Sequence, residues 1–225
     1  MKKHNLLFLF LLTHLVNFAQ DTLSNHFSVA PIKNNFLYIG IENPISIDVA
    51  DIPSTALIVS TSNGSISGSN GDYMITPVSG NHLQISIYVL VCKYDTSYVG
   101  EQFFRLKKLP DPEVWFAQLD RDSIATVGEL LSGGGIISRL EDFSYDIRIP
   151  IKSFELKAVY NNKETILRST GNAYTPDMKA LIQNAVPGTK ITVQNIIVIY
   201  PGKSERQLSK TITVRIVSQE ERYKK

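Results

Sequence analysis

The chain has 225 residues, of which 43% are hydrophobic and 20% are charged, and its formal net charge is +2 at pH 7. These proportions are ordinary for a soluble globular protein and exclude an intrinsically disordered one. A nearly balanced charge gives no general attraction for phosphate backbones or anionic lipid, so nucleic acid is excluded as an expected partner.

The first twenty residues have the pattern of a secretory signal peptide. Lys2 and Lys3 precede an apolar run over residues 6–18, and Ala19-Gln20 provides a cleavage point. This run is short for a membrane span, which needs roughly 20 apolar residues, and an uncleaved anchor is the alternative. Cleavage removes two of the 23 basic residues and none of the 21 acidic ones, so the mature net charge is near zero. The sequence therefore predicts an exported protein, periplasmic or secreted, with no membrane insertion after cleavage.

Residues 21–35 are polar and are expected to form a flexible lead-in to a first domain over residues 36–109. Within this domain, short apolar segments alternate with turn signals, and Asn-Gly dipeptides at 63–64 and 70–71 tolerate positive φ. The clearest strand is 83–91, where every second residue is apolar. Seven strands are predicted, at residues 36–41, 45–49, 56–61, 65–69, 73–76, 83–91 and 103–106. This pattern predicts an immunoglobulin-like antiparallel β-sandwich, in architecture only, because the cysteine pair of antibody domains is missing.

A proline-rich stretch divides the chain near its middle. Pro110 and Pro112 cannot donate ladder hydrogen bonds and push the preceding residues towards extended geometry, so residues 110–113 are predicted to form a stiff hinge. Trp115 and Phe116 follow directly. On a strand one ring faces inward and the other outward, and an outward ring is a candidate anchor for a partner protein. The alternative is that both rings pack against the hinge.

Residues 114–218 are predicted to form a β-rich α+β domain. Thr126 and Glu129 have capping-box spacing, which predicts a short helix. Thr175 followed by Pro176 predicts the start of a second helix. The expected buried stripe of that second helix is Met178, Leu181, Ile182 and Ala185.

The strands of this domain carry their own signals. Apolar residues move from odd to even positions after residue 151, which predicts a bulge at residues 152–153. Pro150 is expected on an edge strand, where no ladder donor is needed. Residues 191–200 and 211–217 are predicted to be strands joined through Pro201-Gly202. The charged tail, residues 219–225, is expected to be frayed.

Residues that could carry chemistry are few. Cys92 is the single cysteine and is expected to be a half-buried packing residue; an intermolecular disulfide in a homodimer is the alternative. After signal cleavage His26 and His82 remain, and neither has a histidine or cysteine at metal-ligand spacing. The acidic pair at 120–122 lacks the glycine and distal glutamate of a calcium loop, and the triple glycine at 133–135 lacks the lysine of a phosphate loop. The sequence therefore predicts no enzyme, no cofactor and no metal site.

Three stretches resemble the periplasmic C-terminal region of the GldM/PorM family, which comprises shaft proteins of gliding motility and type IX secretion. The first is LYIGIENPISI at 37–47 followed by SNGSI at 62–66, and the second is FRLKKLPDP at 104–112. The third combines residues 135–137, 140–143, 175–181 and 186–190. They follow the order of the family and span nearly all of the mature chain.

The resemblance implies two consecutive β domains, no catalysis, dimers, and contacts with envelope proteins, namely outer-membrane ring lipoproteins or the full-length shaft protein. The family also has an N-terminal membrane helix and a helical periplasmic domain, where this chain has a signal peptide, so coupling to the inner-membrane motor is not carried over. In the family a glycine-rich segment leads into the short helix, and residues 120–123 replace it here. Any contact that the family makes through that segment is therefore not carried over to this chain. The function predicted is a non-catalytic exported interaction module, an accessory or paralogue of the shaft. The alternative is a secreted β-sandwich that binds carbohydrate or cell-surface ligands, which an exposed aromatic row on one sheet face would favour.

Overall fold

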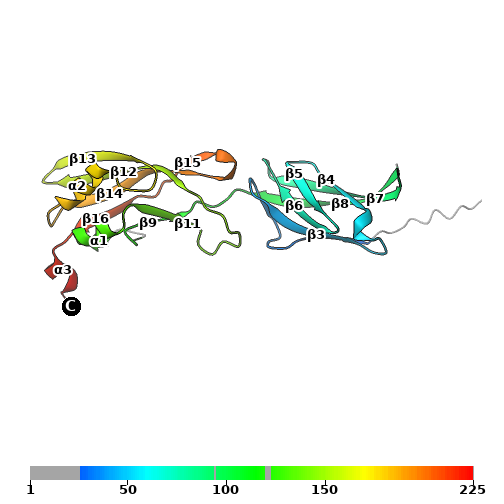
Figure 1. Ribbon diagram of the computed structural model, residues 1–225, viewed down its shortest axis with the longest axis horizontal. Coiled ribbons are helices and arrows are strands. Elements are labelled where there is room, and N and C mark those ends of the chain that lie inside the picture. The colour runs from blue at the N-terminus through cyan, green and yellow to red at the C-terminus, as the bar shows by residue number, and fades with distance from the viewer. Residues whose placement is uncertain (1–25, 94, 120–122, 225) are drawn as a thin grey trace, which may run out of the picture.

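The structure, a computed structural model, describes residues 26–93, 95–119 and 123–224. The predicted signal peptide and the acidic pair at 120–122 lie outside these residues. Two β-rich domains follow one another end to end in an elongated body (Figure 1). The predicted fold class is confirmed, because the protein is mainly β, with a sandwich followed by a domain that adds short helices to its sheets.

Two four-stranded sheets form the first domain, in the strand orders β1-β3-β6-β5 and β2-β8-β7-β4. The strands are β1 (Phe27–Pro31), β2 (Leu37–Tyr38), β3 (Asn43–Val49), β4 (Leu57–Thr61), β5 (Ser65–Ser69), β6 (Asp72–Thr76), β7 (His82–Cys92) and β8 (Asp95–Lys107), with a 3-10 turn, η1 (Ser54–Ala56), before β4. The pairing is antiparallel except where the short β2 runs parallel to β8.

The core of this sandwich is made by the alternating apolar residues that the sequence shows. Ile45 and Ile47 of β3 are buried against Ile85 and Ile87 of β7, all at 1% exposure or less. The β5–β6 hairpin closes through Asn70 and Gly71, whose φ angles of 57° and 90° suit a two-residue primed turn.

The predicted flexible lead-in is wrong for residues 27–31, which form β1. This strand pairs with β3 from Phe27↔Val49 to Pro31↔Ile45. The segment alternates apolar and small residues, but it is short and ends in proline, so its pattern is weak. The Phe27 ring lies over Gly100 of β8, where an added Cβ would come within 2.3 Å of a ring carbon. β1 is therefore an integral part of the sandwich.

The last strand of the sandwich is longer than predicted. β8 begins at Asp95 rather than at 103, and with β7 it forms a long hairpin. The first residues of β8 are polar and exposed, so their strand conformation depends on pairing with β7 and leaves no apolar period in the sequence.

The second domain has two sheets. In the smaller one, β9 (Glu113–Phe116) pairs antiparallel with β11 (Ile136–Arg139). The larger one has the order β10-β16-β14-β12-β13, with β15 also pairing with β14. Its strands are β10 (Ser123–Ala125), β12 (Ile151–Tyr160), β13 (Lys163–Thr170), β14 (Lys190–Ile199), β15 (Glu205–Gln207) and β16 (Ile212–Ile216). The helices are α1 (Val127–Ser132), α2 (Pro176–Gln183), α3 (Gln219–Tyr223) and a 3-10 turn, η2 (Pro201–Lys203).

Both predicted helices are confirmed. Before α1, the Thr126 hydroxyl accepts a hydrogen bond from the Glu129 backbone N–H, and the Glu129 carboxylate accepts one from the Thr126 N–H at 2.7 Å, which is a capping box. Thr175 caps α2. Met178 and Ile182 of α2 are fully buried, and the remaining members of the predicted stripe pack against the core: Leu181 and Ala185.

The predicted bulge is confirmed, and the placement of Pro150 is wrong. The register between β12 and β14 shifts between Ile151 and Ser153 and again between Ser153 and Glu155. Pro150 precedes β12, which is an internal strand, and its carbonyl accepts a hydrogen bond from the Ile199 N–H at 2.9 Å. The proline is tolerated because the strand starts one residue later, where a ladder donor is present.

The prediction of a frayed tail is also wrong for most of its residues, because they form α3. Ser218 caps this helix by accepting a hydrogen bond from the Glu221 N–H at 3.1 Å, and Arg222 forms an ion pair with Glu129 at 3.0 Å. The sequence carries a signal for this helix, because a serine followed by acidic residues favours a helix start. No helix among the described residues is long and apolar enough to cross a membrane.

Candidate interaction site at the domain junction

The segment that joins the domains is packed on both sides. Leu109, directly before the hinge prolines, is buried within the core cluster of the second domain. Ile41, from the turn between β2 and β3 of the first domain, is buried in that same cluster. Because one residue from the sandwich and one from the link share the core of the second domain, the two domains are attached through side chains as well as through the backbone.

Asn43 is the polar centre of this junction and is fully buried. Its Oδ1 accepts hydrogen bonds from the Tyr38 N–H at 2.7 Å and from the Tyr145 hydroxyl at 3.2 Å. Its Nδ2 donates to the carbonyls of Tyr38, Ile41 and Ile75, at 2.8–3.1 Å. The bond to Tyr145 crosses between the domains, so a buried amide that shapes the β2–β3 turn also attaches that turn to the second domain.

Aromatic rings from both domains surround this hydrogen bond. The Tyr38 ring centroid lies 4.9 Å from that of Phe143 and 5.6 Å from that of Tyr145. Lys33 closes the group from the first domain, since its Nζ donates to the Ser144 carbonyl at 2.8 Å and lies 4.5 Å from the Tyr145 centroid. Burial raises the pKa of both tyrosine hydroxyls, which keeps them protonated and able to donate.

A second polar cluster holds the hinge itself. The Tyr200 hydroxyl lies 3.0 Å from both the Pro110 carbonyl and Asp111 Oδ1. Arg206 Nη1 donates to Asp111 at 2.5 Å and to the Leu109 carbonyl at 3.3 Å, and the guanidinium lies 4.1 Å from the Tyr200 ring centroid. Burial, helped by the neighbouring carboxylate of Asp111, raises the pKa of Tyr200 to about 12. These bonds fix the hinge against β14 and β15.

A pocket of about 560 Å³ lies over the junction. Its lining comes from both domains and from the hinge: Ile39, Gly40, Thr76, Pro77, Val78, Lys108, Leu109, Tyr200, Pro201, Gly202, Ser204, Glu205 and Arg206. Val78 is 69% exposed at this place. The pocket combines apolar surface with cations and one carboxylate, a composition that suits contact with another protein.

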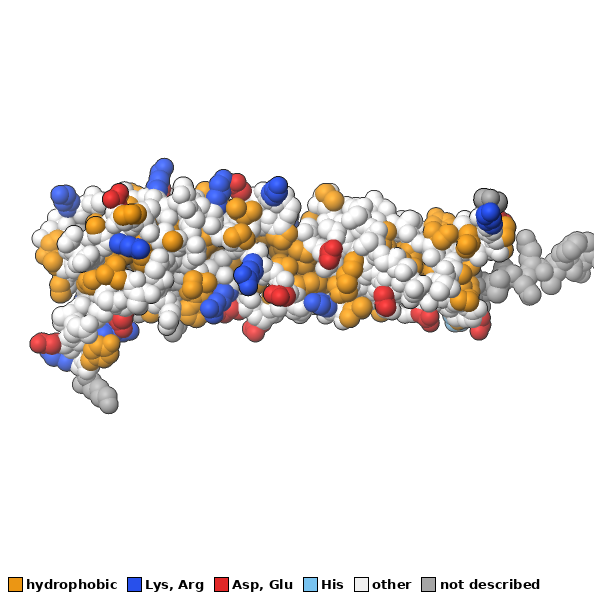
Figure 2. Space-filling view, in the orientation of Figure 1, with side chains coloured by type: hydrophobic (Ala, Val, Ile, Leu, Met, Phe, Trp, Pro, Cys, Tyr) orange, Lys and Arg blue, Asp and Glu red, His pale blue; other side chains and the backbone are white. Residues whose placement is uncertain are grey.

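The surface in view shows no large region of one charge sign. Acidic and basic side chains are scattered along both domains, with hydrophobic side chains between them (Figure 2). On the face shown, this distribution agrees with the balanced composition.

The two aromatic residues predicted to contact a partner lie on opposite faces of β9. Phe116 is fully buried, with its ring centroid 6.2 Å from that of Tyr174, so it belongs to the core and cannot anchor a partner. Trp115 is partly exposed and lies opposite Ile137, itself an exposed residue of β11. The Trp115 Nε1 has no hydrogen-bond partner among the described residues. A role for Trp115 in partner contact stays a prediction.

The other sequence candidates are not brought together. Cys92 is exposed at the end of β7, so the prediction of a half-buried residue is wrong. His82 begins that strand, which places the two residues at its opposite ends. Within the described ranges no three His, Cys, Asp or Glu side chains gather as a metal site would require.

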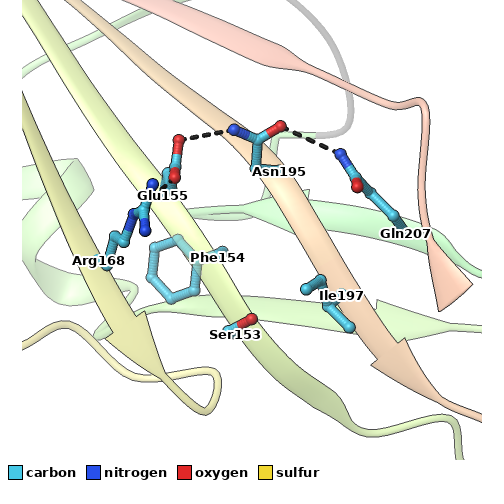
Figure 3. Close-up of a pocket in the computed structure, with 7 residues that line it drawn as sticks. All are labelled: Ser153, Phe154, Glu155, Arg168, Asn195, Ile197 and Gln207. Carbon is cyan, nitrogen blue, oxygen red and sulfur yellow. Dashed lines mark hydrogen bonds and ion pairs between the residues drawn. The ribbon is translucent and has the colours of Figure 1, made fainter. Parts of the chain in front are cut away.

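A polar chain crosses four strands of the larger sheet at the β12 bulge (Figure 3). Arg168 forms an ion pair with Glu155 at 2.7 Å, Asn195 donates to Glu155 at 2.7 Å, and Gln207 donates to Asn195 at 3.1 Å. The hydrogen bond from Asn195 is the main reason that the pKa of Glu155 lies below its usual value, against the opposing effect of burial. Gln207 follows Arg206 on β15, so this chain fixes the strand that holds the hinge.

The prolines of the hinge are visible in the sequence, but the residues that form hydrogen bonds around the junction are not. No motif marks Asn43, Tyr145 or Arg206 in the sequence. They are separated by as many as 163 positions, and no spacing rule relates residues so far apart. The one available signal is that Asn43 lies inside the first stretch that resembles the GldM family.

Taken together, the two domains and their packed junction define an elongated, two-domain β protein. Family models match consecutively: the model described as GldM third domain covers residues 26–107, and the one described as GldM C-terminal domain covers residues 110–219. The chain belongs to the GldM family. No curated protein matched the sequence.

Two solved structures align along most of the chain, at low structural and sequence similarity. Fibronectin(III)-like modules of Clostridium thermocellum CbhA align over 85% of this chain and 94% of theirs, at 12% identity and a TM-score of 0.28. Domains 4 and 5 of the S-layer protein SbsC align over 86% of this chain and 98% of theirs, at 9% identity and a TM-score of 0.32.

Membership of the family places the protein in a broad class. GldM-family domains are structural rather than catalytic, act as shaft-like components of gliding motility and type IX secretion, and assemble with other proteins. In the family, the C-terminal domains are periplasmic.

Proposed function

We propose that the protein is a non-catalytic, exported structural module that works as an accessory or paralogue of the type IX secretion and gliding-motility shaft. The observation that carries this proposal is the packed junction, in which the buried Asn43–Tyr145 bond joins the two domains and the Arg206 cluster holds the hinge to the second domain. A link held on more than one side resists bending more than a free linker does. Such a rod suits a part that spans a distance and presents surfaces at fixed positions.

The partners proposed are envelope proteins, either the outer-membrane ring lipoproteins or the full-length shaft protein, with a homodimer as a further form. Two surfaces support protein contact. One is the junction pocket with its exposed Val78, and the other is the outward face of β9 and β11 with Trp115 and Ile137. Aromatic side chains such as that of Trp115 are enriched at the centres of interfaces.

The test is a pull-down of the tagged mature chain, residues 21–225, from the envelope fraction of its own cells, analysed by mass spectrometry. The proposal expects ring lipoproteins or the full-length shaft protein, with recovery reduced by Trp115→Ala or Val78→Glu. Tyr160→Ala is the matched control, because Tyr160 is an exposed aromatic residue at the far end of β12. A folded, exported protein that recovers neither partner would contradict the proposed role.

Rigidity is tested separately by small-angle scattering of the mature chain. A single narrow distribution of interdomain distances is expected, and Arg206→Met together with Tyr145→Phe should broaden it. A broad distribution in the unmodified protein would mean that the junction contacts do not hold the domains in solution.

A further inference from the structure

The outer face of the β2-β8-β7-β4 sheet carries an apolar row that no contact within the described chain covers. Ile58, Tyr88 and Tyr98 lie directly beside one another on β4, β7 and β8, according to the register of the sheet. They point outward, because their sequence neighbours Leu57 and Ile87 are buried in the sandwich core. Tyr98 is 52% exposed, which is high for a ring in the middle of a strand pair.

The Tyr98 ring is held in place although it is exposed. Its hydroxyl donates to Glu101 Oε2 at 3.2 Å, and its centroid lies 5.6 Å from that of Tyr88 with the planes 64° apart. The Tyr88 ring contacts the Tyr98 ring, and the Glu101 carboxylate accepts a hydrogen bond from the Tyr98 hydroxyl. Because the Tyr98 side chain is already held by these two contacts, it loses little conformational freedom when a ligand binds to its exposed face.

A polar row runs parallel to the apolar one. Ser60, Ser86 and Glu101 are paired across the same three strands. Gln84 donates to the Ser86 hydroxyl at 3.3 Å and to Glu101 Oε2. Both bonds to Glu101 reach Oε2, so Oε1 has no hydrogen bond from the described part of the chain. Hydroxyls, an amide and a free carboxylate oxygen therefore lie next to a fixed aromatic ring.

We propose that this face binds a neutral oligosaccharide. One face of a pyranose ring carries C–H groups and packs on an aromatic side chain, here Tyr98, while its hydroxyls need donors and acceptors that replace water. Glu101 Oε1 accepts from a sugar hydroxyl, and Ser86 offers a further polar contact.

Charge argues against the other simple occupant, a second copy of the chain. In a two-fold pairing the same patch meets itself. Of the six residues in the two rows only Glu101 is charged, and Arg105, on the same face of β8, lies four residues further along the strand. Pairing of the two rows would therefore remove two carboxylates from water without a cation in either row to compensate them. A neutral ligand rich in hydroxyls avoids that cost, because it hydrogen-bonds to the carboxylate.

The face belongs to the end of the sandwich where the β7–β8 hairpin projects, away from the second domain (Figure 1). The proposal therefore adds a ligand to the protein without involving the junction, and it does not rest on the shaft role. If the protein binds no oligosaccharide, the envelope pull-down result is unaffected. If the pull-down recovers no shaft component, oligosaccharide binding is unaffected.

The experiment is isothermal titration of the mature chain with cellohexaose, laminarihexaose and chitohexaose. Binding of at least one of them is expected. Tyr98→Ala should weaken that binding by about tenfold or more, in the range of measured aromatic stacking contributions. Tyr98→Phe keeps the ring but removes its bond to Glu101 and should weaken binding less. Tyr160→Ala is the control and should bind as the unmodified protein does, because Tyr160 is a comparably exposed tyrosine, at 45%, in the other domain.

Three results would overturn the proposal. The first is absence of binding to all three hexasaccharides by a chain whose circular dichroism shows it folded. The second is binding that Tyr98→Ala leaves unchanged. The third is a dimer, seen by light scattering, that Tyr98→Ala converts to monomer, because the face would then be a contact between two copies.

Discussion

Replacement of Asn43 by alanine tests whether the junction has the buried polar centre described above. The substitution removes five hydrogen bonds, two accepted by Oδ1 and three donated by Nδ2. At about 1 kcal/mol net for each bond, with some carbonyls regaining water, the free energy of unfolding should fall by about 3–5 kcal/mol. That is a large part of the roughly 5–15 kcal/mol typical of a domain.

The assay is guanidinium denaturation followed by two signals. Circular dichroism reports on both domains, while fluorescence of Trp115, the single tryptophan, reports on the second. Because the Tyr145 hydroxyl loses its acceptor, Asn43→Ala should lower the midpoint of both signals although the substitution is in the first domain. Asn63→Ala is the matched control: this half-buried side chain makes two solvent-exposed hydrogen bonds, to the Val78 N–H and the Ser79 carbonyl, so its loss should cost about 1 kcal/mol or less.

A destabilisation by Asn43→Ala no larger than that by Asn63→Ala would refute the reasoning. A shift in circular dichroism without one in fluorescence would show that Asn43 supports only its own domain. Tyr145→Phe isolates the interdomain bond and, combined with Asn43→Ala in a double-mutant cycle, should give a coupling energy of about 1 kcal/mol.

Three further outcomes are expected. Gly100→Ala should displace the Phe27 ring from β8, because its Cβ would lie within 2.3 Å of a ring carbon, and hydrogen exchange should show reduced protection at residues 27–31; unchanged protection would contradict the contact. Thr126→Ala should lower the free energy of unfolding by about 1 kcal/mol through loss of the α1 cap, whereas Thr126→Ser should restore most of it. The pKa of Tyr200 is raised to about 12. The stability this shift contributes is complete below the unfolded pKa of about 10 and is lost as the pH rises towards 12, so Tyr200→Phe should lose less stability over that interval.

The sequence predicts the local turns, caps and bulge correctly, but it does not predict all of the strand residues. The α1 capping box, the β12 bulge and the Asn-Gly turns depend on residues within a few positions of one another, and each appears where its pattern predicts it. β1 and the first part of β8 were missed because their residues become strand only by pairing with β3 and β7. Pairing is decided by partners far along the chain, so a window of sequence carries little sign of it.

The candidate sites divide in the same way. The sequence alone determined that one of Trp115 and Phe116 faces inward, since successive side chains on a strand alternate, and only the tertiary structure decided that it is Phe116. The prolines determined where the domains meet, because they cannot continue a ladder. That the junction is held by Asn43, Tyr145 and Arg206, and that Tyr88 and Tyr98 form one row, follows from strand register and domain packing. Contacts between residues distant along the chain depend on the whole fold, and no local periodicity records them.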